Sequence, residues 1–231
     1  MPQKNSLKKY LENGYYHVYN RGVEKREIFL DEQDYKVFLH FLKQYLSPPS
    51  PKDLLLAGLH PDGEHPPQTI HDQVHLLAYC LMPNHFHFLL KQITIDGMTK
   101  LLRRVCTNYV MFFNKKYKRV GTLFQGIYKA VSVETDEYLL HLSRYIHLNP
   151  VLDRVAPCRG MNPPETPIDY PFSSYQNYLG KITTPWVKPE EILSFFKTAQ
   201  RTSLKDILSY QSFVEDYQED PKEILGRLVI E

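Results

Sequence analysis

Cysteine is scarce in this chain of 231 residues, and its arrangement excludes one class of metal site. The three cysteines, Cys80, Cys106 and Cys158, are far apart and form no C-x-x-C pair. An odd number of separated cysteines argues against a disulfide framework and against a thiolate zinc site. We therefore expect a protein of a reducing, cytoplasmic compartment.

Long apolar runs and nucleotide-binding loops are also missing. No run approaches the ~20 apolar residues that span a bilayer, and the polar residues 1–14 lack the apolar core of a signal peptide. The sequence contains neither a G-x-x-x-x-G-K-[ST] loop nor an H-E-x-x-H motif. We expect a globular protein with no membrane partner and no nucleotide cofactor.

Charge is present but unevenly spread. The net charge is +2. Residues 190–231 hold nine acids and five bases, a net −4, so the rest of the chain carries +6. Residues 98–119 contain seven bases and no acid. A helix with this bias suits nucleic-acid phosphates, although charge alone fits a solvated helix face equally well.

Hydrophobic periodicity and turn residues predict the order of the elements. We expect strands at 15–22, 74–82, 85–92 and 122–134, and helices at 31–46, 98–117 and 137–149, the last stopped by Pro150. Residues 47–73 and 157–171 are expected to be irregular, and two acidic helices are expected near 188–198 and 203–217. This order predicts an α+β, ferredoxin-like fold: an antiparallel sheet with helices on one face, plus a C-terminal helical extension. We expect one domain over 1–180, with a loop insertion at 47–73, and an acidic extension over 181–231.

The stretch "LMPNHFHFLLKQ" (81–92) places two histidines inside an apolar strand. Because side chains alternate along a strand, His85 and His87 point to one face and Phe86 and Phe88 to the other. Two imidazoles at this spacing can share one metal ion. Two ordinary hydrogen-bonded histidines are the alternative, and a third ligand, such as an amide or a carboxylate, would favour the metal.

The stretch "LLHLSRYIHLNPV" (139–151) supplies a tyrosine and an amide on one helix face. Tyr145 and Asn149 are four residues apart, which brings their side chains together. Tyr16 and Asn20 share the spacing but lie in a predicted strand, where four residues cover ~13 Å. Packing in a core and a common helix end remain the alternative explanation for Tyr145 and Asn149.

Together these residues suit phosphoryl transfer. Two imidazoles and an amide oxygen can hold a divalent ion that polarises a phosphate. A tyrosine oxygen can then attack phosphorus and form a phosphotyrosine ester. The ester conserves the energy of the broken bond, so another hydroxyl can rejoin the strand without ATP.

Four segments resemble the single-tyrosine HUH transposases, and within them the REP-associated tyrosine transposases of bacteria. "MPNHFHFLL" is similar to the family's histidine–hydrophobe–histidine motif, and "RYIHLNPV" to its tyrosine-helix motif. "YHVYNRG" and "YPFSSY" also match, and the resemblance runs over about residues 14–178. The chain departs from the family at Phe124 and Ile127, where tryptophan and arginine are expected.

The resemblance implies a Mg²⁺- or Mn²⁺-dependent enzyme that nicks and rejoins single-stranded DNA beside a hairpin. It implies that Tyr145 is the nucleophile and that His85, His87 and Asn149 hold the metal. It also implies a bacterial, nucleoid-associated protein, and its known members leave monomer and homodimer open.

Further DNA contacts follow as hypotheses from charge and aromatic content. Basic side chains of the 98–117 helix can neutralise the phosphates of a hairpin stem, and exposed aromatic rings can stack on unpaired bases. The candidates are Arg103, Arg104, Lys115, Lys116, Tyr16 and Tyr19.

Three other functions stay open at this point. The first is a non-catalytic, RRM-like module that binds single-stranded nucleic acid. The second is a replication or mobilisation nickase of the wider HUH group, although such proteins often carry two tyrosines and a helicase region. The third is a metal-dependent hydrolase in which Tyr145 takes no part.

Overall fold

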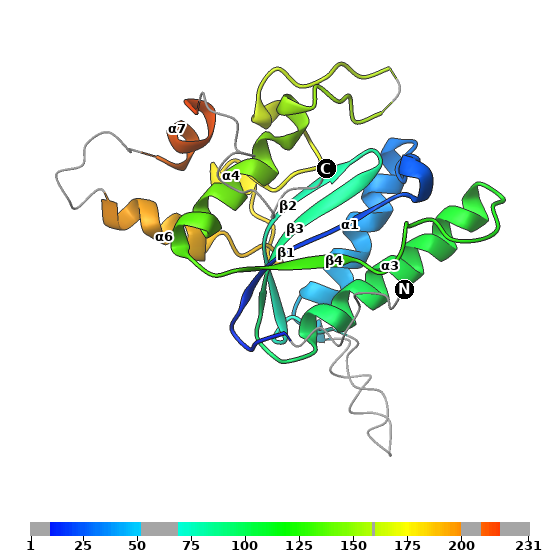
Figure 1. Ribbon diagram of the computed structural model, residues 1–231, viewed down its shortest axis with the longest axis horizontal. Helices are drawn as coiled ribbons and strands as arrows, with labels where there is room; N and C mark the ends of the chain where they lie inside the picture. The colour runs from blue at the N-terminus through cyan, green and yellow to red at the C-terminus, as the bar shows by residue number, and fades with distance from the viewer. Residues whose placement is uncertain (1–9, 52–68, 159, 200–208, 218–231) are drawn as a thin grey trace, which may run out of the picture.

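A four-stranded antiparallel sheet forms the centre of the molecule (Figure 1). The computed structural model describes residues 10–51, 69–158, 160–199 and 209–217. The strands are β1 (Tyr15–Arg21), β2 (Val74–Met82), β3 (His85–Gln92) and β4 (Lys129–Val133), in the order β2-β3-β1-β4. The element order and the antiparallel pairing confirm the predicted α+β, ferredoxin-like class.

One face of the sheet is covered by α1 (Glu32–Leu46) and α3 (Gly97–Lys116), which pack against each other. Asp31 caps α1, and its side chain and that of Asp34 form a capping box. Phe86 and Phe88 point to this face and meet Phe38 of α1. The two phenylalanines beside the histidines therefore fill the main core, as their alternation predicts.

The opposite side of the sheet carries α4 (Asp136–Leu152), which packs against β2 and β3 (Figure 1). Thr135 caps α4, because its side chain accepts a hydrogen bond from the backbone N–H of Tyr138. The prediction that Pro150 stops this helix is wrong, since α4 continues to Leu152. Pro150 removes one backbone donor in the last turn, and the helix continues for two residues beyond it.

The fourth strand is shorter than predicted. β4 begins at Lys129 rather than at residue 122. Before it, Phe124 makes only an isolated bridge to Gly22, and the N–H of Gln125 donates to the carbonyl of Arg21. Residues 125–127 are exposed and lie outside the regular ladder, so this segment runs beside β1 as a loop.

Short helices of the C-terminal part pack near α4. These are α5 (Tyr175–Tyr178), α6 (Glu190–Ala199), α7 (Tyr210–Glu215) and the 3-10 turn Pro167–Asp169. A second 3-10 turn, Val23–Lys25, follows β1 near the other end of the chain. The predicted helix at 188–198 corresponds to α6, whereas only 210–215 of the predicted 203–217 are described as helical. Residues 52–68 of the predicted loop lie outside the described residues.

Residues beyond 180 contribute to the same core as the sheet. Trp186, Val187 and Ile192 are buried, and the backbone of Val187 bridges to Leu76 of β2. The separation of 181–231 as an extension stays a prediction. Among the described helices, none is long and apolar enough to cross a bilayer.

Candidate active site

The two histidines of β3 lie on the face of the sheet that α4 covers. His87 pairs with Tyr19 of β1 and His85 pairs with Arg21, and the alternation aims all four side chains away from α1 and α3. Both imidazoles are buried, and their ring centroids are 4.8 Å apart. The strand therefore holds the pair as neighbours on one surface, as the sequence predicts.

A third histidine orients the pair. His17 of β1 is fully buried, and its Nε2 lies 2.9 Å from Nδ1 of His87. The amide Nδ2 of Asn149 lies 3.3 Å from Nε2 of His87, and an amide nitrogen can only donate. His87 consequently carries its proton on Nδ1 and donates it to His17, which leaves the lone pair of Nε2 directed at Asn149.

Asn84, the residue before the histidine pair, orients the imidazole of His85 in the same way. The Oδ1 of Asn84 accepts a hydrogen bond from Nδ1 of His85, so Nε2 of His85 keeps its lone pair. The Nδ2 of Asn84 donates to the carbonyl of Lys25, 3.3 Å away, and the carbonyl of Asn84 accepts from Gly22. Asn84 thus joins the histidine site to the 3-10 turn that follows β1.

The helix α4 brings the tyrosine and the amide to the histidines. The ring centroid of Tyr145 lies 5.5 Å from that of His87 and 6.3 Å from that of His17, edge-on to both. Asn149, one turn later, reaches Nε2 of His87. The structure therefore brings together His85, His87, Tyr145 and Asn149, the four residues that the sequence singles out from two distant segments.

Burial keeps these groups neutral. Desolvation first, then the positive charge of Arg21, lowers the pKa of His85 to about 3, and burial lowers the pKa of His87 well below its usual value. Burial raises the pKa of the Tyr145 phenol, while the amide of Asn149 and, more weakly, Arg21 oppose that rise. Both imidazoles thus offer lone pairs at neutral pH, and the phenol holds its proton.

The donor set fits a divalent cation. Nε2 of both histidines is unprotonated, and the buried Oδ1 of Asn149 has no hydrogen-bond partner. Turning the amide of Asn149 exchanges its oxygen and nitrogen, which aims that oxygen at the space beside His87 Nε2. Two imidazole nitrogens and one amide oxygen suit Mn²⁺ or Mg²⁺ with positions left for a phosphate. Among the described residues, no group of three His, Cys, Asp or Glu side chains could hold a metal, so the amide is needed.

The four basic candidates lie on α3, across the sheet from the histidines. Arg103 and Lys115 are exposed, and the guanidinium of Arg104 lies 5.6 Å from the centre of the Tyr45 ring. Lys116 is engaged within the protein, because its ammonium lies 2.7 Å from oxygens of Asp31 and Asp34. A hairpin stem on this surface would reach the histidines only around an edge of the sheet.

The two tyrosines offered for base stacking are buried, not exposed as expected. Tyr16 points to the α1 and α3 face and packs edge-on against Tyr10, and its hydroxyl accepts a hydrogen bond from the N–H of Leu11. Tyr19 points to the other face and packs beside His17 and His87. The strand alternation places the two rings on opposite faces, so they cannot serve one strand of DNA together.

Sequence reasoning missed three residues of this site. His17 and Arg21 share a strand face with Tyr19, and Asn84 precedes His85. His17, Tyr19 and Arg21 are every second residue of "YYHVYNR", so a strand places their side chains on one face. That face can be assigned to the site only when the pairing of β1 with β3 is known. Asn84 lies between two predicted strands, and nothing in the sequence shows that its amide bonds both His85 and Lys25.

A family model matches the part of the chain that contains this site. Residues 68–149 match the family described as "Transposase IS200 like". None of the curated proteins is significantly similar in sequence.

Two solved structures resemble the chain weakly. The structure of a REP-associated tyrosine transposase bound to a REP hairpin is 14% identical and has a TM-score of 0.49, covering 79% of this chain and 90% of that one. A tRNA(His) guanylyltransferase from Saccharomyces cerevisiae is 13% identical with a TM-score of 0.39, covering 89% of this chain and 79% of the enzyme.

The family match covers β2, β3, α3, β4 and most of α4, and so includes both histidines, the tyrosine and the amide. Residues 68–149, which hold all four of these side chains, are therefore the part of the chain that is similar to the IS200-like transposase family.

Proposed function

We propose that the chain nicks and rejoins single-stranded DNA through a covalent bond to Tyr145, with His85, His87 and Asn149 as ligands of a Mg²⁺ or Mn²⁺ ion. The observation that carries the proposal is the position of Tyr145, whose ring lies 5.5 Å from that of His87 although the two residues come from different elements. The match of residues 68–149 to the IS200-like transposase family supports a DNA-processing activity.

The chemistry conserves the number of phosphate ester bonds. The hydroxyl oxygen of Tyr145 attacks the scissile phosphorus, and the bond from phosphorus to the 3′ oxygen of the neighbouring nucleotide breaks. The proton of the phenol ends on that 3′ oxygen, so the products are a 5′-phosphotyrosine ester and a 3′ hydroxyl. Attack of a 3′ hydroxyl on the ester is the same reaction in reverse and reseals the strand.

The residues of the chain prepare this exchange. The buried position of Tyr145 excludes bulk water, which protects the ester from hydrolysis. The amide of Asn149 opposes the effect of burial on the pKa of the Tyr145 phenol. A bound divalent ion would supply charge that polarises the phosphate and stabilises the transition state. His17 and Asn84 hold the two imidazoles in the tautomers that such an ion requires.

The test is capture of the covalent adduct. A 3′-labelled single strand with a hairpin is incubated with the protein and Mn²⁺, and the products are separated under denaturing conditions. The wild-type protein is expected to retain label, whereas Tyr145→Phe and chelated wild-type protein are expected to lose at least ~99% of it, because no other group supplies the nucleophile. Tyr138→Phe is the matched control, since Tyr138 lies on the same helix and is 41% exposed.

Each alternative outcome of this experiment would indicate a different function. An adduct that survives in Tyr145→Phe contradicts the assignment of the nucleophile. Binding without any adduct, under either metal, indicates a binding module, and release of cleaved product with no covalent stage indicates a hydrolase. A strand without the hairpin, run in parallel, decides whether the hairpin is part of the substrate.

A further inference from the structure

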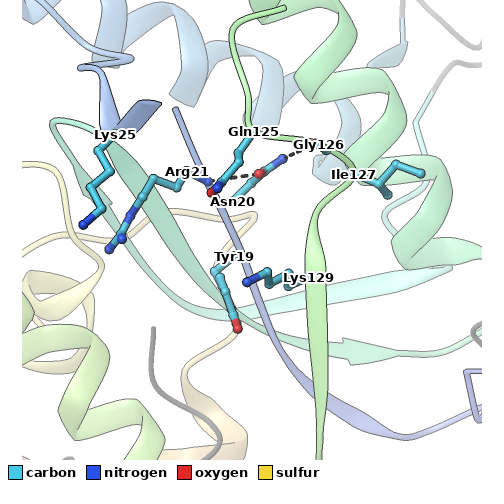
Figure 2. A pocket seen from close by; sticks show the side chains of 8 residues that line it. All are labelled: Tyr19, Asn20, Arg21, Lys25, Gln125, Gly126, Ile127 and Lys129. Atoms are coloured by element: carbon cyan, nitrogen blue, oxygen red, sulfur yellow. Dashed lines mark hydrogen bonds between the residues drawn. The ribbon is translucent and has the colours of Figure 1, made fainter. Parts of the chain in front are cut away.

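A cavity of about 360 Å³ lies between β1 and the loop that precedes β4 (Figure 2). Its volume is within the range of ~300–1,000 Å³ that is typical of small-ligand sites. Tyr19 forms one side of the cavity, and its ring also packs beside His87, 6.2 Å between centroids. The cavity therefore lies next to the histidine site, and Tyr19 contacts both.

Hydrogen bonds within the protein fix the walls. The Nδ2 of Asn20 donates to the carbonyl of Gly126, 3.0 Å away, and the N–H of Gln125 donates to the carbonyl of Arg21, 2.8 Å away. On the other side, Asn84 holds the carbonyl of Lys25. The cavity is thus formed before any ligand arrives, and Asn84 couples one of its walls to His85.

The lining is cationic. Arg21, Lys25 and Lys129 line the cavity, and no acidic residue does. Among the described residues, none of the three forms an ion pair. Figure 2 shows the side chains of Arg21, the last residue of β1, and Lys25, in the turn that follows, extending side by side. A polyanion is the ligand that this charge would attract.

Two details of these cations point to a ligand. The buried Nε of Arg21 has no hydrogen-bond partner among the described residues, and an unmade bond of this kind is costly. Lys25 and its neighbour Glu24 adopt left-handed backbone conformations, with φ of 60° and 56°. Strain of this sort in non-glycine residues accumulates at binding sites, where it fixes the direction of a side chain.

The other side of the cavity suits a flat ring. The ammonium of Lys129 lies 5.7 Å from the centre of the Tyr19 ring, and Figure 2 shows the two side chains next to each other. Ile127 is 75% exposed although it is a large apolar residue. An unpaired base could contact both Tyr19 and Ile127 while its phosphate meets Arg21.

We propose that this cavity takes one unpaired nucleotide next to the phosphate that Tyr145 attacks, with its phosphate on Arg21 and Lys25 and its base against Tyr19 and Ile127. The proposal rests on the proposed function, because it assumes that single-stranded DNA runs past the histidine site. It adds a positioning role for residues that neither the motif pair nor the family description assigns.

The first measurement is the salt dependence of binding. Affinity for the hairpin-bearing strand is followed by fluorescence anisotropy between 50 and 300 mM NaCl, without added metal. Arg21→Gln and Lys25→Gln are each expected to reduce the slope of log K against log[salt] by ~0.7, the value for one phosphate contact with a single strand. Lys43→Gln, on α1 across the sheet, is the charge-matched control and is expected to leave the slope unchanged.

The second measurement locates the base. A single abasic site is moved through the three positions on each side of the cleaved bond. Wild-type protein is expected to bind about tenfold more weakly at one position, as for loss of one stacked base. In Ile127→Ser this penalty is expected to fall to within twofold of the other positions. Ile127 is exposed, so this variant keeps the wild-type fold, which the melting temperature checks.

The outcomes separate the two proposals. Wild-type protein that forms the adduct, with slopes of Arg21→Gln and Lys25→Gln equal to that of Lys43→Gln, overturns the cavity assignment alone. An abasic penalty that Ile127→Ser leaves intact also overturns it. Reduced slopes and a localised penalty in a protein that never forms an adduct support the cavity and contradict the proposed function.

Discussion

His17 touches His87 and belongs to the site without being one of its predicted ligands. Replacing it with phenylalanine keeps an aromatic ring in the stack but removes the Nε2 that accepts the proton of His87. Loss of such an orienting partner typically weakens metal binding 10–100-fold. We expect His17→Phe to shift the Mn²⁺ midpoint of adduct formation upward by about this factor and to leave metal-free DNA binding unchanged.

The matched control is His40→Phe, an exposed histidine on α1. If His17→Phe shows the same Mn²⁺ midpoint as His40→Phe, the hydrogen bond between His17 and His87 has no influence on the cation. A loss of DNA binding in the same variant would instead indicate that His17 supports the sheet surface itself.

The residues of the site differ in how far the sequence could reveal them. Periodicity places His85 with His87, and Tyr145 with Asn149, on shared faces of single elements, and the resemblance to a known family implies their roles. His17 and Arg21 could not be found in the same way, since their role depends on pairing between β1 and β3. The burial of Tyr16 depends on its packing against Tyr10, and that of Tyr19 on its packing beside the histidines. Neither packing contact can be read from a local pattern.

At the scale of elements, α6 is tied to the sheet by one carboxylate. An oxygen of Glu191 lies 2.9 Å from the ammonium of Lys91, the same oxygen accepts from the hydroxyl of Tyr15 at 2.7 Å, and His75 lies nearby. The contact with His75, followed by those with Lys91 and Tyr15, lowers the pKa of Glu191 to about 2 against the opposing effect of burial. Since the folded pKa is below the unfolded one, this stabilisation is full above pH ~4.5 and is lost as the pH falls toward 2.

Glu191→Gln is therefore expected to lower the free energy of unfolding at pH 7 by about 1–2 kcal/mol, after allowance for solvent screening of a partly exposed group. At pH 2 it should match the wild type. Urea unfolding at the two pH values measures both. Glu190→Gln, the exposed neighbour, serves as control, and an equal loss in that variant would show that the effect comes from net charge.

The boundaries of elements show which local signals were sufficient. β2 and β3 begin and end at the residues predicted from the apolar pattern, 74–82 and 85–92. β4 starts late because residues 122–128 form no continuous ladder with β1: Phe124 makes an isolated bridge to Gly22, Gln125 bonds to Arg21, and residues 125–127 are exposed. α4 passes Pro150 because tertiary burial of its last turn outweighs the lost donor. α5 has four residues, too few for a periodic signal.

At the scale of the whole molecule, the C-terminal segments pack against α4, the helix that carries Tyr145, and hold it in position. His147 lies on α4, and its two ring nitrogens contact the hydroxyl of Tyr210 at 2.7 Å and that of Ser174 at 2.8 Å. The guanidinium of Arg144 lies 4.3 Å from the centre of the Phe213 ring and donates to the backbone carbonyl of Phe213. One side of α4 thus faces the histidines, and another faces α7 and the Ser174 segment.

From these contacts we predict that removal of residues 181–231 lowers both the stability and the activity of the remaining chain. Removal of α6 and α7 would uncover the buried His147 and Arg144 and the apolar surface under Trp186 and Val187. Since exposing buried apolar area costs about 25 cal/mol per Å², we expect a melting temperature at least ~5 °C lower. Because α4 would then be free to shift relative to β3, adduct formation should fall more than tenfold while hairpin binding falls less.

A Tyr210→Phe variant of the full chain distinguishes the positioning of α4 from overall stability, since it removes only the hydroxyl that His147 and Ser143 contact. A cut protein with wild-type melting temperature and adduct yield would instead make residues 181–231 an independent extension.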